Sequence, residues 1–194
     1  EERETVVAIS ELIEYYKGIF TTLSSCASRQ LEEVTFRRAT ISVPELMATA
    51  GKYFRKVYKG NKAHIDFKIQ LLEGRITGDW NQLRFLLENL IDEACSVTLD
   101  GAVCLSARED GEFIRFLFTD MRREKTREEL NQLFYPDLSR MTAGEKGELY
   151  GTEYLVCKQI IRDHDEFAGR RGCRINAEPG KEGGFTIYFT LPKK

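Results

Sequence analysis

The segment from residue 78 to residue 95, GDWNQLRFLLENLIDEAC, constrains the fold more than any other part of the chain. Asp79 can accept a hydrogen bond from the backbone N–H of Gln82, and the Gln82 side chain can reach back, so a capping box opens a helix here. Apolar residues then recur at steps of three and four, which predicts one buried face: Trp80, Leu83, Leu86, Leu87, Leu90, Ile91, Ala94 and Val97. The rest of the chain must pack around that face.

Two polar residues, Asn89 and Glu93, lie one helical turn apart at the edge of this apolar face, because successive helical residues are rotated by about 100°. Long-reach polar side chains beside a buried face can point into a cleft and form a binding site. The alternative is a solvated pair at the margin of a core helix, and helix geometry alone favours that alternative.

Residues 6–27 carry a seam typical of a coiled coil or a helix hairpin, with apolar side chains at alternating steps of three and four: Val6, Ile9, Ile13, Tyr16, Phe20, Leu23 and Ala27. We favour one long helix to about Phe36 over a hairpin with a bend between Ser24 and Ser28. Such a seam needs a partner, and a second copy of the chain is the simplest one, so we predict a homodimer. Residues 1–40 then form a dimerisation-type helix, and residues 41–194 form a second domain.

The remaining sequence alternates between helix-like and strand-like patterns. Capping boxes at Ser42–Glu45 and Thr126–Glu129 open two further helices, and apolar–polar alternation marks half-buried strands. The predicted order is a strand at 41–43, a helix to 59, a strand at 63–72 with a short return at 75–77, the helix described above, paired strands at 103–107 and 113–118, a helix from 126, an irregular stretch at 135–150, a helix at 152–164, and strands at 173–177 and 185–191. This order implies an α+β fold, a two-layer sandwich with helices on one face of a mixed sheet.

Charge and cysteine content exclude several classes of function. The chain has 29 Lys and Arg against 31 Asp and Glu, so no basic field attracts nucleic acid. Its five cysteines form no CxxC pair, which fits reduced thiols in the cytoplasm and argues against a structural metal site. No apolar run approaches the roughly 20 residues of a membrane span. Because the chain starts inside a helical pattern without Met, we expect a cytoplasmic piece of a longer, receptor-like protein that can be anchored in a membrane.

Four motifs in order resemble the ATP-binding domain of sensor histidine kinases, a branch of the GHKL superfamily, over about Ser42 to Pro192. The family helix motif Asn-Leu-Leu-x-Asn-Ala corresponds to residues 89–94, NLIDEA. The family motif Asp-x-Gly-x-Gly corresponds to residues 120–124, DMRRE, and Gly-Leu-Gly-Leu corresponds to residues 151–154, GTEY. The closing pattern Gly-x-x-Phe-x-Phe-x-Leu-Pro corresponds to residues 183–192, GGFTIYFTLP. The resemblance implies a histidine-kinase ATPase fold for residues 41–194.

The resemblance also assigns the nucleotide site, residue by residue. Asp120 takes the position that reads adenine, and Asn89 and Glu93 take the positions that hold Mg²⁺, which prefers oxygen ligands. Gly147, Gly151 and Glu153 fall in the lid and in the glycine motif whose backbone N–H groups cradle phosphate. In an ATP-using protein these six residues would form the site.

The departures from the family pattern fall on this chemistry. Glu93 replaces the Mg²⁺-binding Asn, and Arg122 and Glu124 replace glycines that let the backbone pass under the base. Glu153 replaces the second glycine of the phosphate motif, where one charge about 4 Å from a phosphate costs roughly 4 kcal/mol at an effective dielectric near 20. Neither of the two histidines, His64 and His164, stands in a phosphoacceptor context, although an acceptor can lie upstream of Glu1.

We therefore predict a degenerate sensor histidine kinase of a two-component system, a pseudokinase that relays conformation or binds partners without efficient use of ATP and has no catalytic residue. The alternative is an ATP-binding histidine kinase with a non-standard site, which phosphorylates a His upstream of this fragment; ATP and Mg²⁺ are cofactors only in that alternative. The expected partners are a second copy of the chain, an upstream sensor region, and a response regulator or another signalling protein.

Overall fold

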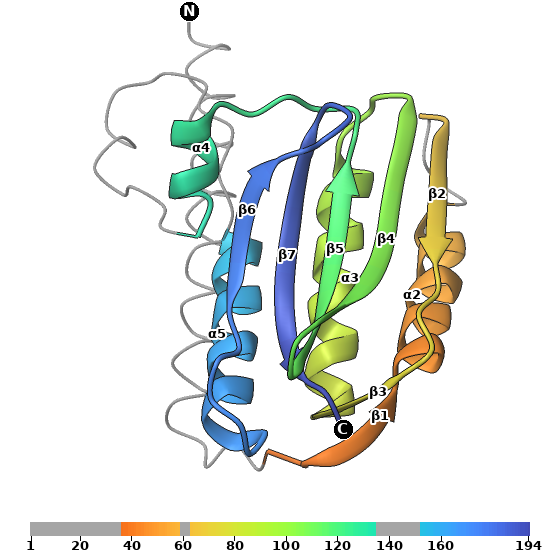
Figure 1. Cartoon of the computed structure of the whole chain (residues 1–194). Coiled ribbons are helices and arrows are strands. Elements are labelled where there is room, and N and C mark those ends of the chain that lie inside the picture. The colour runs from red at the N-terminus through yellow and green to blue at the C-terminus, as the bar shows by residue number, and fades with distance from the viewer. Residues whose placement is uncertain (1–35, 59–62, 135–151) are drawn as a thin grey trace, which may run out of the picture.

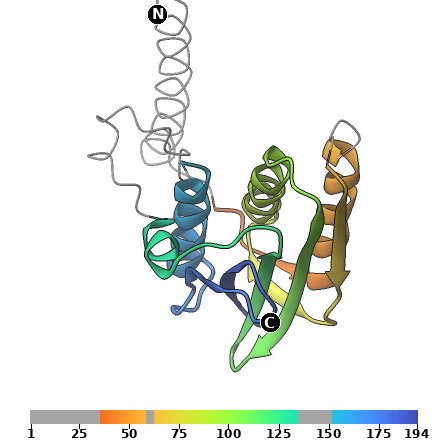
Figure 2. The ribbon, with the colours of Figure 1, turned by 90° about the horizontal axis from the view of Figure 1, so that it is seen from above.

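Helices lie on one face of the sheet, as the two perpendicular views show (Figures 1 and 2). This sheet has five strands among the described residues. The computed structural model describes residues 36–58, 63–134 and 152–194. Within these ranges the α+β fold, with a mixed sheet covered by helices on one side, is confirmed.

The sheet has the strand order β2-β4-β5-β7-β6. Its first pair is parallel and its other pairs are antiparallel. The strands are β2 (Ile65–Gln70), β4 (Gly101–Asp110), β5 (Phe113–Asp120), β6 (Ile175–Pro179) and β7 (Phe185–Pro192). Buried and part-buried residues alternate along β5, because successive side chains point to opposite faces. On the buried face Phe116 stacks on Phe189 of β7, with 5.0 Å between ring centroids.

The helices on that face are α2 (Val43–Tyr58), α3 (Trp80–Ser96) and α5 (Thr152–Phe167), and α3 lies between the other two (Figure 2). The short helix α4 (Arg127–Gln132) begins with the predicted capping box of Thr126 and Glu129. The apolar face predicted for α3 is confirmed: the residues from Leu83 to Ala94 that define it are buried. α3 is therefore the central helix of the core.

One predicted strand pairing is wrong. The segment after β2 does not return along it; instead β3 (Arg75–Gly78) pairs with β1 (Ala39–Ser42) in a separate two-stranded antiparallel sheet. β2 pairs with β4, which follows α3 in the chain. A parallel pair needs such a crossover connection, and residue patterns do not state which distant strand becomes the neighbour.

Other predicted features lie at shifted boundaries or outside the described residues. α5 ends at Phe167 rather than at His164, and β6 begins at Ile175 rather than at Cys173. The long N-terminal helix and most of the irregular stretch fall in residues 1–35 and 135–151, so both stay predictions. Among the described residues, no helix combines the length and apolar character needed to cross a bilayer.

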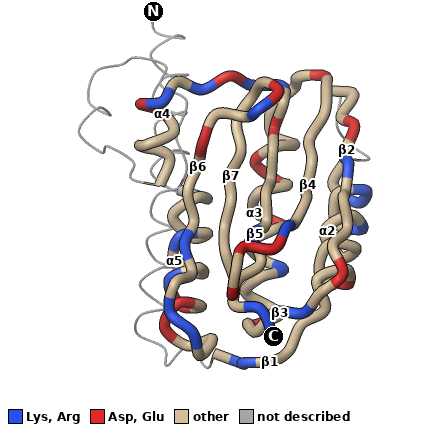
Figure 3. Tube along the Cα trace, viewed as in Figure 1, with Lys and Arg blue, Asp and Glu red and all other residues tan. Residues whose placement is uncertain are grey.

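Basic and acidic residues are interspersed along the described strands and helices (Figure 3). This mixture agrees with the near balance of 29 basic against 31 acidic side chains in the whole chain. Electrostatic interactions in this chain are therefore mainly local ion pairs. The most buried ion pairs lie where β5 ends, beside α3.

Candidate functional site

Two acidic residues that the sequence assigned to the nucleotide site lie close together. Asp120 is the last residue of β5 and is only 1% exposed. Glu93 projects from the C-terminal part of α3. Two arginines directly after Asp120 connect them, and we call Glu93, Asp120, Arg122 and Arg123 the arginine clamp.

Arg122 is the inner half of the clamp, and its side chain is 0% exposed. Its Nε and Nη2 donate to the two oxygens of Asp120 at 2.9 and 2.8 Å, and its backbone N–H donates to the same carboxylate at 3.0 Å. The remaining donors reach main-chain oxygens, at 2.6 Å from Ala94 O and 3.1 Å from Leu99 O. Arg122 thus ties the end of β5 to the C-terminal end of α3.

Space for Arg122 is provided by a glycine. Gly101, the first residue of β4, has φ +132°, and a Cβ at this position would come within 2.9 Å of the Arg122 Cγ. Only glycine readily combines this backbone conformation with so close an approach. The aliphatic stem of Arg122 therefore lies directly against the β4 backbone.

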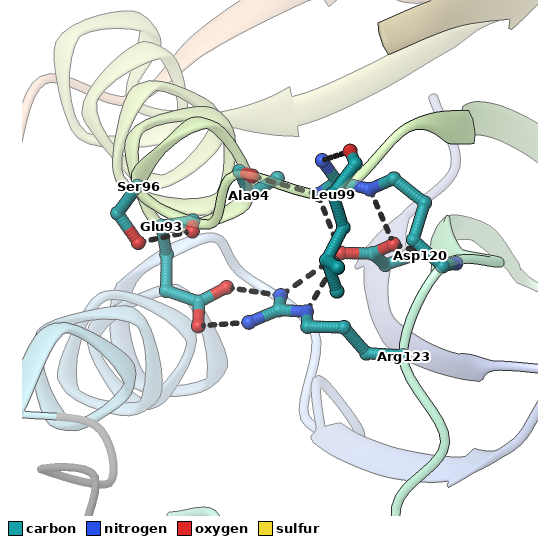
Figure 4. Close-up of polar contacts among 7 residues, drawn as sticks. Glu93, Ala94, Ser96, Leu99, Asp120 and Arg123 are labelled. Carbon is teal, nitrogen blue, oxygen red and sulfur yellow. Dashed lines mark hydrogen bonds and ion pairs between the residues drawn. The ribbon is translucent and has the colours of Figure 1, made fainter. Parts of the chain in front are cut away.

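Arg123 is the outer half of the clamp and lies between Glu93 and Asp120 (Figure 4). Its Nη1 and Nη2 donate to the two oxygens of Glu93 at 2.9 and 2.7 Å, and its Nε donates to Asp120 Oδ2 at 2.9 Å. Paired bonds between a guanidinium and a carboxylate are strong and geometrically specific. Arg123 therefore joins α3 to β5 where the resemblance assigns a metal ion.

The electrostatics of the clamp favour its charged form. Burial alone would raise the pKa of Asp120, but the hydrogen bonds from Arg122 and the charge of Arg123 outweigh it and hold this pKa below its usual range. Burial would lower the pKa of Arg123, whereas the bonds to Glu93 and the charge of Asp120 raise it. Two carboxylates and two guanidiniums make the group neutral as a whole, so the buried charges compensate one another.

Aromatic residues border the clamp on two sides. Phe185 pairs with Asp120 across β5 and β7, and its ring lies 5.3 Å from the Arg123 guanidinium carbon. From the first turn of α5, buried Tyr154 packs edge-on against Phe134 with 5.9 Å between centroids. Burial and the nearby Glu93 carboxylate raise the pKa of Tyr154 well above its usual value. These rings place apolar groups on two sides of the clamp.

The residue that replaces the last glycine of the family motif also makes a specific contact. Glu124 accepts a hydrogen bond from the backbone N–H of Gly184 at 3.0 Å. Gly184 has φ +68°, and a Cβ there would overlap the carbonyl oxygen of Asp120. Within the described residues no non-glycine residue has positive φ, so Arg122 and Glu124 take their places without left-handed backbone.

The other predicted site residues are not brought together in this way. Asn89 turns back on its own helix, where its Nδ2 donates to Phe85 O at 2.7 Å. Gly147 and Gly151 lie outside the described residues, and of Glu153 only its place in α5 is described. The sequence predictions missed the roles of Arg122, Arg123 and Phe185, although two arginines in a glycine-rich family motif were a visible signal.

Comparison with known proteins identifies the family. Residues 78–194 match the model described as histidine kinase-, DNA gyrase B- and HSP90-like ATPase, which covers more than half of the chain. The chain belongs to this ATPase family. It is also 26% identical over 176 residues to the adaptive-response sensory kinase SasA of Thermosynechococcus vestitus, covering 90% of this chain and 44% of that kinase. The chain thus spans less than half the length of this curated relative.

Solved histidine kinases share the fold of this ATPase-family chain. The nucleotide-free catalytic domain of the histidine kinase ThkA is similar with a TM-score of 0.61 and 18% identity, over 81% of this chain and 96% of that domain. A structure of ThkA in complex with the response regulator protein TrrA gives a TM-score of 0.70 and 16% identity, over 96% of this chain and 50% of that one. The Acinetobacter baumannii histidine kinase AdeS gives 0.65 and 13%, over 93% and 79%.

The arginine clamp does not fit the Mg-ATP that this ATPase family is expected to bind. An adenine amino group needs a free oxygen on Asp120, yet both oxygens accept from arginine. A metal ion needs the Glu93 carboxylate, yet both of its oxygens accept from Arg123. In the described part of the chain, no three His, Cys, Asp or Glu side chains are grouped to hold a metal. Arg123 instead places its own positive charge between the Glu93 and Asp120 carboxylates.

Proposed function

We propose that this chain is a signalling module of the two-component type that relays conformation and binds partners without using ATP. The single observation that supports the proposal is the arginine clamp, in which Arg122 and Arg123 donate to both oxygens of Asp120 and Arg123 donates to both oxygens of Glu93. Opening it for a nucleotide would leave buried charges unpaired, which costs about 3–5 kcal/mol for a broken buried pair. The favourable free energy of nucleotide binding would have to exceed that cost.

Partners of the module follow from its relatives and from its sequence. A complex of ThkA with a response regulator is known, and the apolar seam of residues 6–27 suits a second copy of the chain. We propose a homodimer that contacts a response regulator or another signalling protein. An upstream sensor region of a longer chain would supply its input.

A thermal-shift experiment with Mg-ATP tests the central claim. A ligand at a hundred times its dissociation constant adds about 2.7 kcal/mol of stability, which raises the melting temperature of a domain of this size by roughly 5–10 °C. At millimolar Mg-ATP we expect no shift beyond that of matched salt. A clear shift that Asp120→Ala removes would contradict the proposal and favour an ATP-binding kinase with a non-standard site.

Variants that open the clamp provide the positive arm of this experiment. Arg122→Gly and Arg123→Gly combined with Glu93→Asn remove both guanidiniums and the extra carboxylate, and we expect part of the Mg-ATP shift to appear. Adding Asp120→Ala should abolish it. Arg171→Ala is the matched control, because this arginine is exposed and pairs only with Asp165 among the contacts described for it; it should leave the response to Mg-ATP unchanged.

A further inference from the structure

The beginning of α3 differs from the predicted capping box in one hydrogen bond. Asp79 Oδ1 accepts from the backbone N–H of Gln82 at 3.1 Å, as predicted, and also from that of Asn81 at 2.9 Å. The reciprocal bond from Asp79 N–H to the Gln82 side chain is absent, because this N–H donates to His164 Nε2 at 3.0 Å instead. A residue of α5 has taken the place of Gln82.

Gln82 is left with an unsatisfied group. It is 9% exposed, and its Oε1 has no hydrogen-bond partner. Buried polar atoms are nearly always paired, and an unpaired one costs free energy. Gln82 stands three residues after Asp79, where a capping-box side chain reaches the N–H of the first residue. The unpaired Gln82 Oε1 is therefore suited to accept a hydrogen bond from the Asp79 N–H.

His164 is fully buried and holds a defined tautomer. Its Nδ1 lies 2.8 Å from Ile160 O. Because Nε2 accepts from a backbone N–H, Nδ1 must carry the proton and donate to this carbonyl, so the ring is neutral. Gly78 makes room for the ring, since a Cβ there would come within 2.9 Å of Nε2. Any shift of α5 relative to α3 changes the bond to Asp79.

The segment that leads into the domain touches both partners of this bond. The Phe36 ring meets the His164 ring edge-on with 4.9 Å between centroids, and it also lies 5.8 Å from Phe167. The backbone N–H of Arg37 donates to Asp79 Oδ2 at 2.8 Å. The position of residues 36–37 is therefore coupled to the junction of α3 and α5.

We propose that the Asp79 N–H has two alternative acceptors, His164 Nε2 on α5 and Gln82 Oε1 on α3, and that residues 36–37 select between them. With His164 as acceptor, the two helices are tied together. With Gln82 as acceptor, α3 completes its own capping box and α5 loses this hydrogen bond to α3. The proposal rests on the relay role given under Proposed function, but its geometry does not depend on whether a nucleotide binds.

Protonation of His164 is a second way to change the acceptor, because an imidazolium has no free lone pair. Burial lowers the pKa of His164, while the bond to Ile160 and the charge of Asp79 oppose that effect. The stabilisation given by the neutral ring is complete above the unfolded-state pKa of about 6.5 and is lost as the pH falls below it. The charged group that acts on the ring is Asp79 of α3. Asp163 and Asp165 flank His164 in the α5 sequence, and Arg37 and Arg38 follow Phe36, whose ring packs on it.

Amide hydrogen exchange at Asp79, measured by NMR on the whole chain, tests the proposal. Rates are taken relative to the Phe189 amide in β7, a strand that is paired on both sides, so that global destabilisation cancels. In His164→Phe we expect the Asp79 amide to stay within about threefold of its unmodified protection, because Gln82 accepts the bond. Gln82→Met should leave it unchanged, and the double variant should exchange on the order of 10- to 100-fold faster. Equal rates in His164→Phe and the double variant would overturn the proposal.

Two further arms need no change at His164. As the pH is lowered stepwise below the unfolded-state value of about 6.5 until the unmodified chain loses protection, the Asp79 amide should lose protection at a higher pH in Gln82→Met, since only this variant lacks a second acceptor. Phe36→Ala should speed exchange at Asp79 in the Gln82→Met background and not in the unmodified one. If Gln82→Met makes no difference in either arm, the alternative acceptor does not exist. Neither arm uses ATP, so the Mg-ATP experiment can fail or succeed separately.

Discussion

At the scale of single residues, Arg123 carries the largest predicted effect, because it is the only described link between Glu93 and Asp120. Arg123→Ala should lower the free energy of unfolding by about 3–5 kcal/mol, since both carboxylates lose a buried partner. The matched variant Arg171→Ala removes an ion pair whose arginine is 72% exposed, and it should cost no more than about 1 kcal/mol. Urea unfolding of both variants measures the difference. Similar losses for the two would show that the clamp is not a stabilising feature of the fold.

At the scale of elements, the turn between β6 and β7 is fitted against the end of β5. Gly184 has φ +68°, and a Cβ there would overlap Asp120 O, whereas Gly111 in the β4–β5 turn has φ +61° and open space around it. Gly111→Ala should therefore cost only the left-handed backbone penalty of about 1–2 kcal/mol. Gly184→Ala should cost a further ~1–3 kcal/mol from overpacking. Thermal unfolding of the two variants tests this, and equal stability would mean that the turn can move away from β5.

At the scale of the whole molecule, the apolar seam of residues 6–27 remains a prediction about assembly. A seam of this kind would otherwise face water, so we expect the chain to have the mass of a dimer in light scattering. Phe20→Glu places a charge in the seam and should shift the mass toward that of a monomer. A monomer at every concentration, or an unchanged mass for Phe20→Glu, would exclude dimerisation through this segment.

Local patterns predicted the individual elements well. The periodicity of residues 80–94 identified the central helix, and alternation identified β4, β5 and β7. The pairing of β1 with β3, and the parallel pairing of β2 with β4, depended on contacts between distant segments. Such contacts follow from the packing of the whole domain, which no short window of sequence contains.

The sequence named two of the residues that meet in the arginine clamp but not the contacts between them. Asp120 and Glu93 were named from the family motifs, and Arg122 was noted only as a lost glycine. The two arginines turn inward because of residues distant in the sequence. Gly101 makes room for the Arg122 stem, and Arg123 binds Glu93, which lies 30 residues away in the chain. The capping box at Asp79 was predicted correctly only for the bond that the Asp79 side chain accepts from Gln82. The acceptor of the Asp79 N–H is His164, which lies 85 residues away in the chain and is therefore not visible in the local sequence.

The arginine clamp also restricts the mutational routes that lead away from this sequence. Each of its four residues compensates a buried charge on another, so a single replacement leaves an uncompensated charge and loses about 3–5 kcal/mol. Typical domains have only about 5–15 kcal/mol in total. A variant with an open pocket at this place would have to change several of these positions nearly together, or first accumulate stabilising substitutions elsewhere. Because of this cost, the four clamp residues are more readily retained together than replaced one at a time.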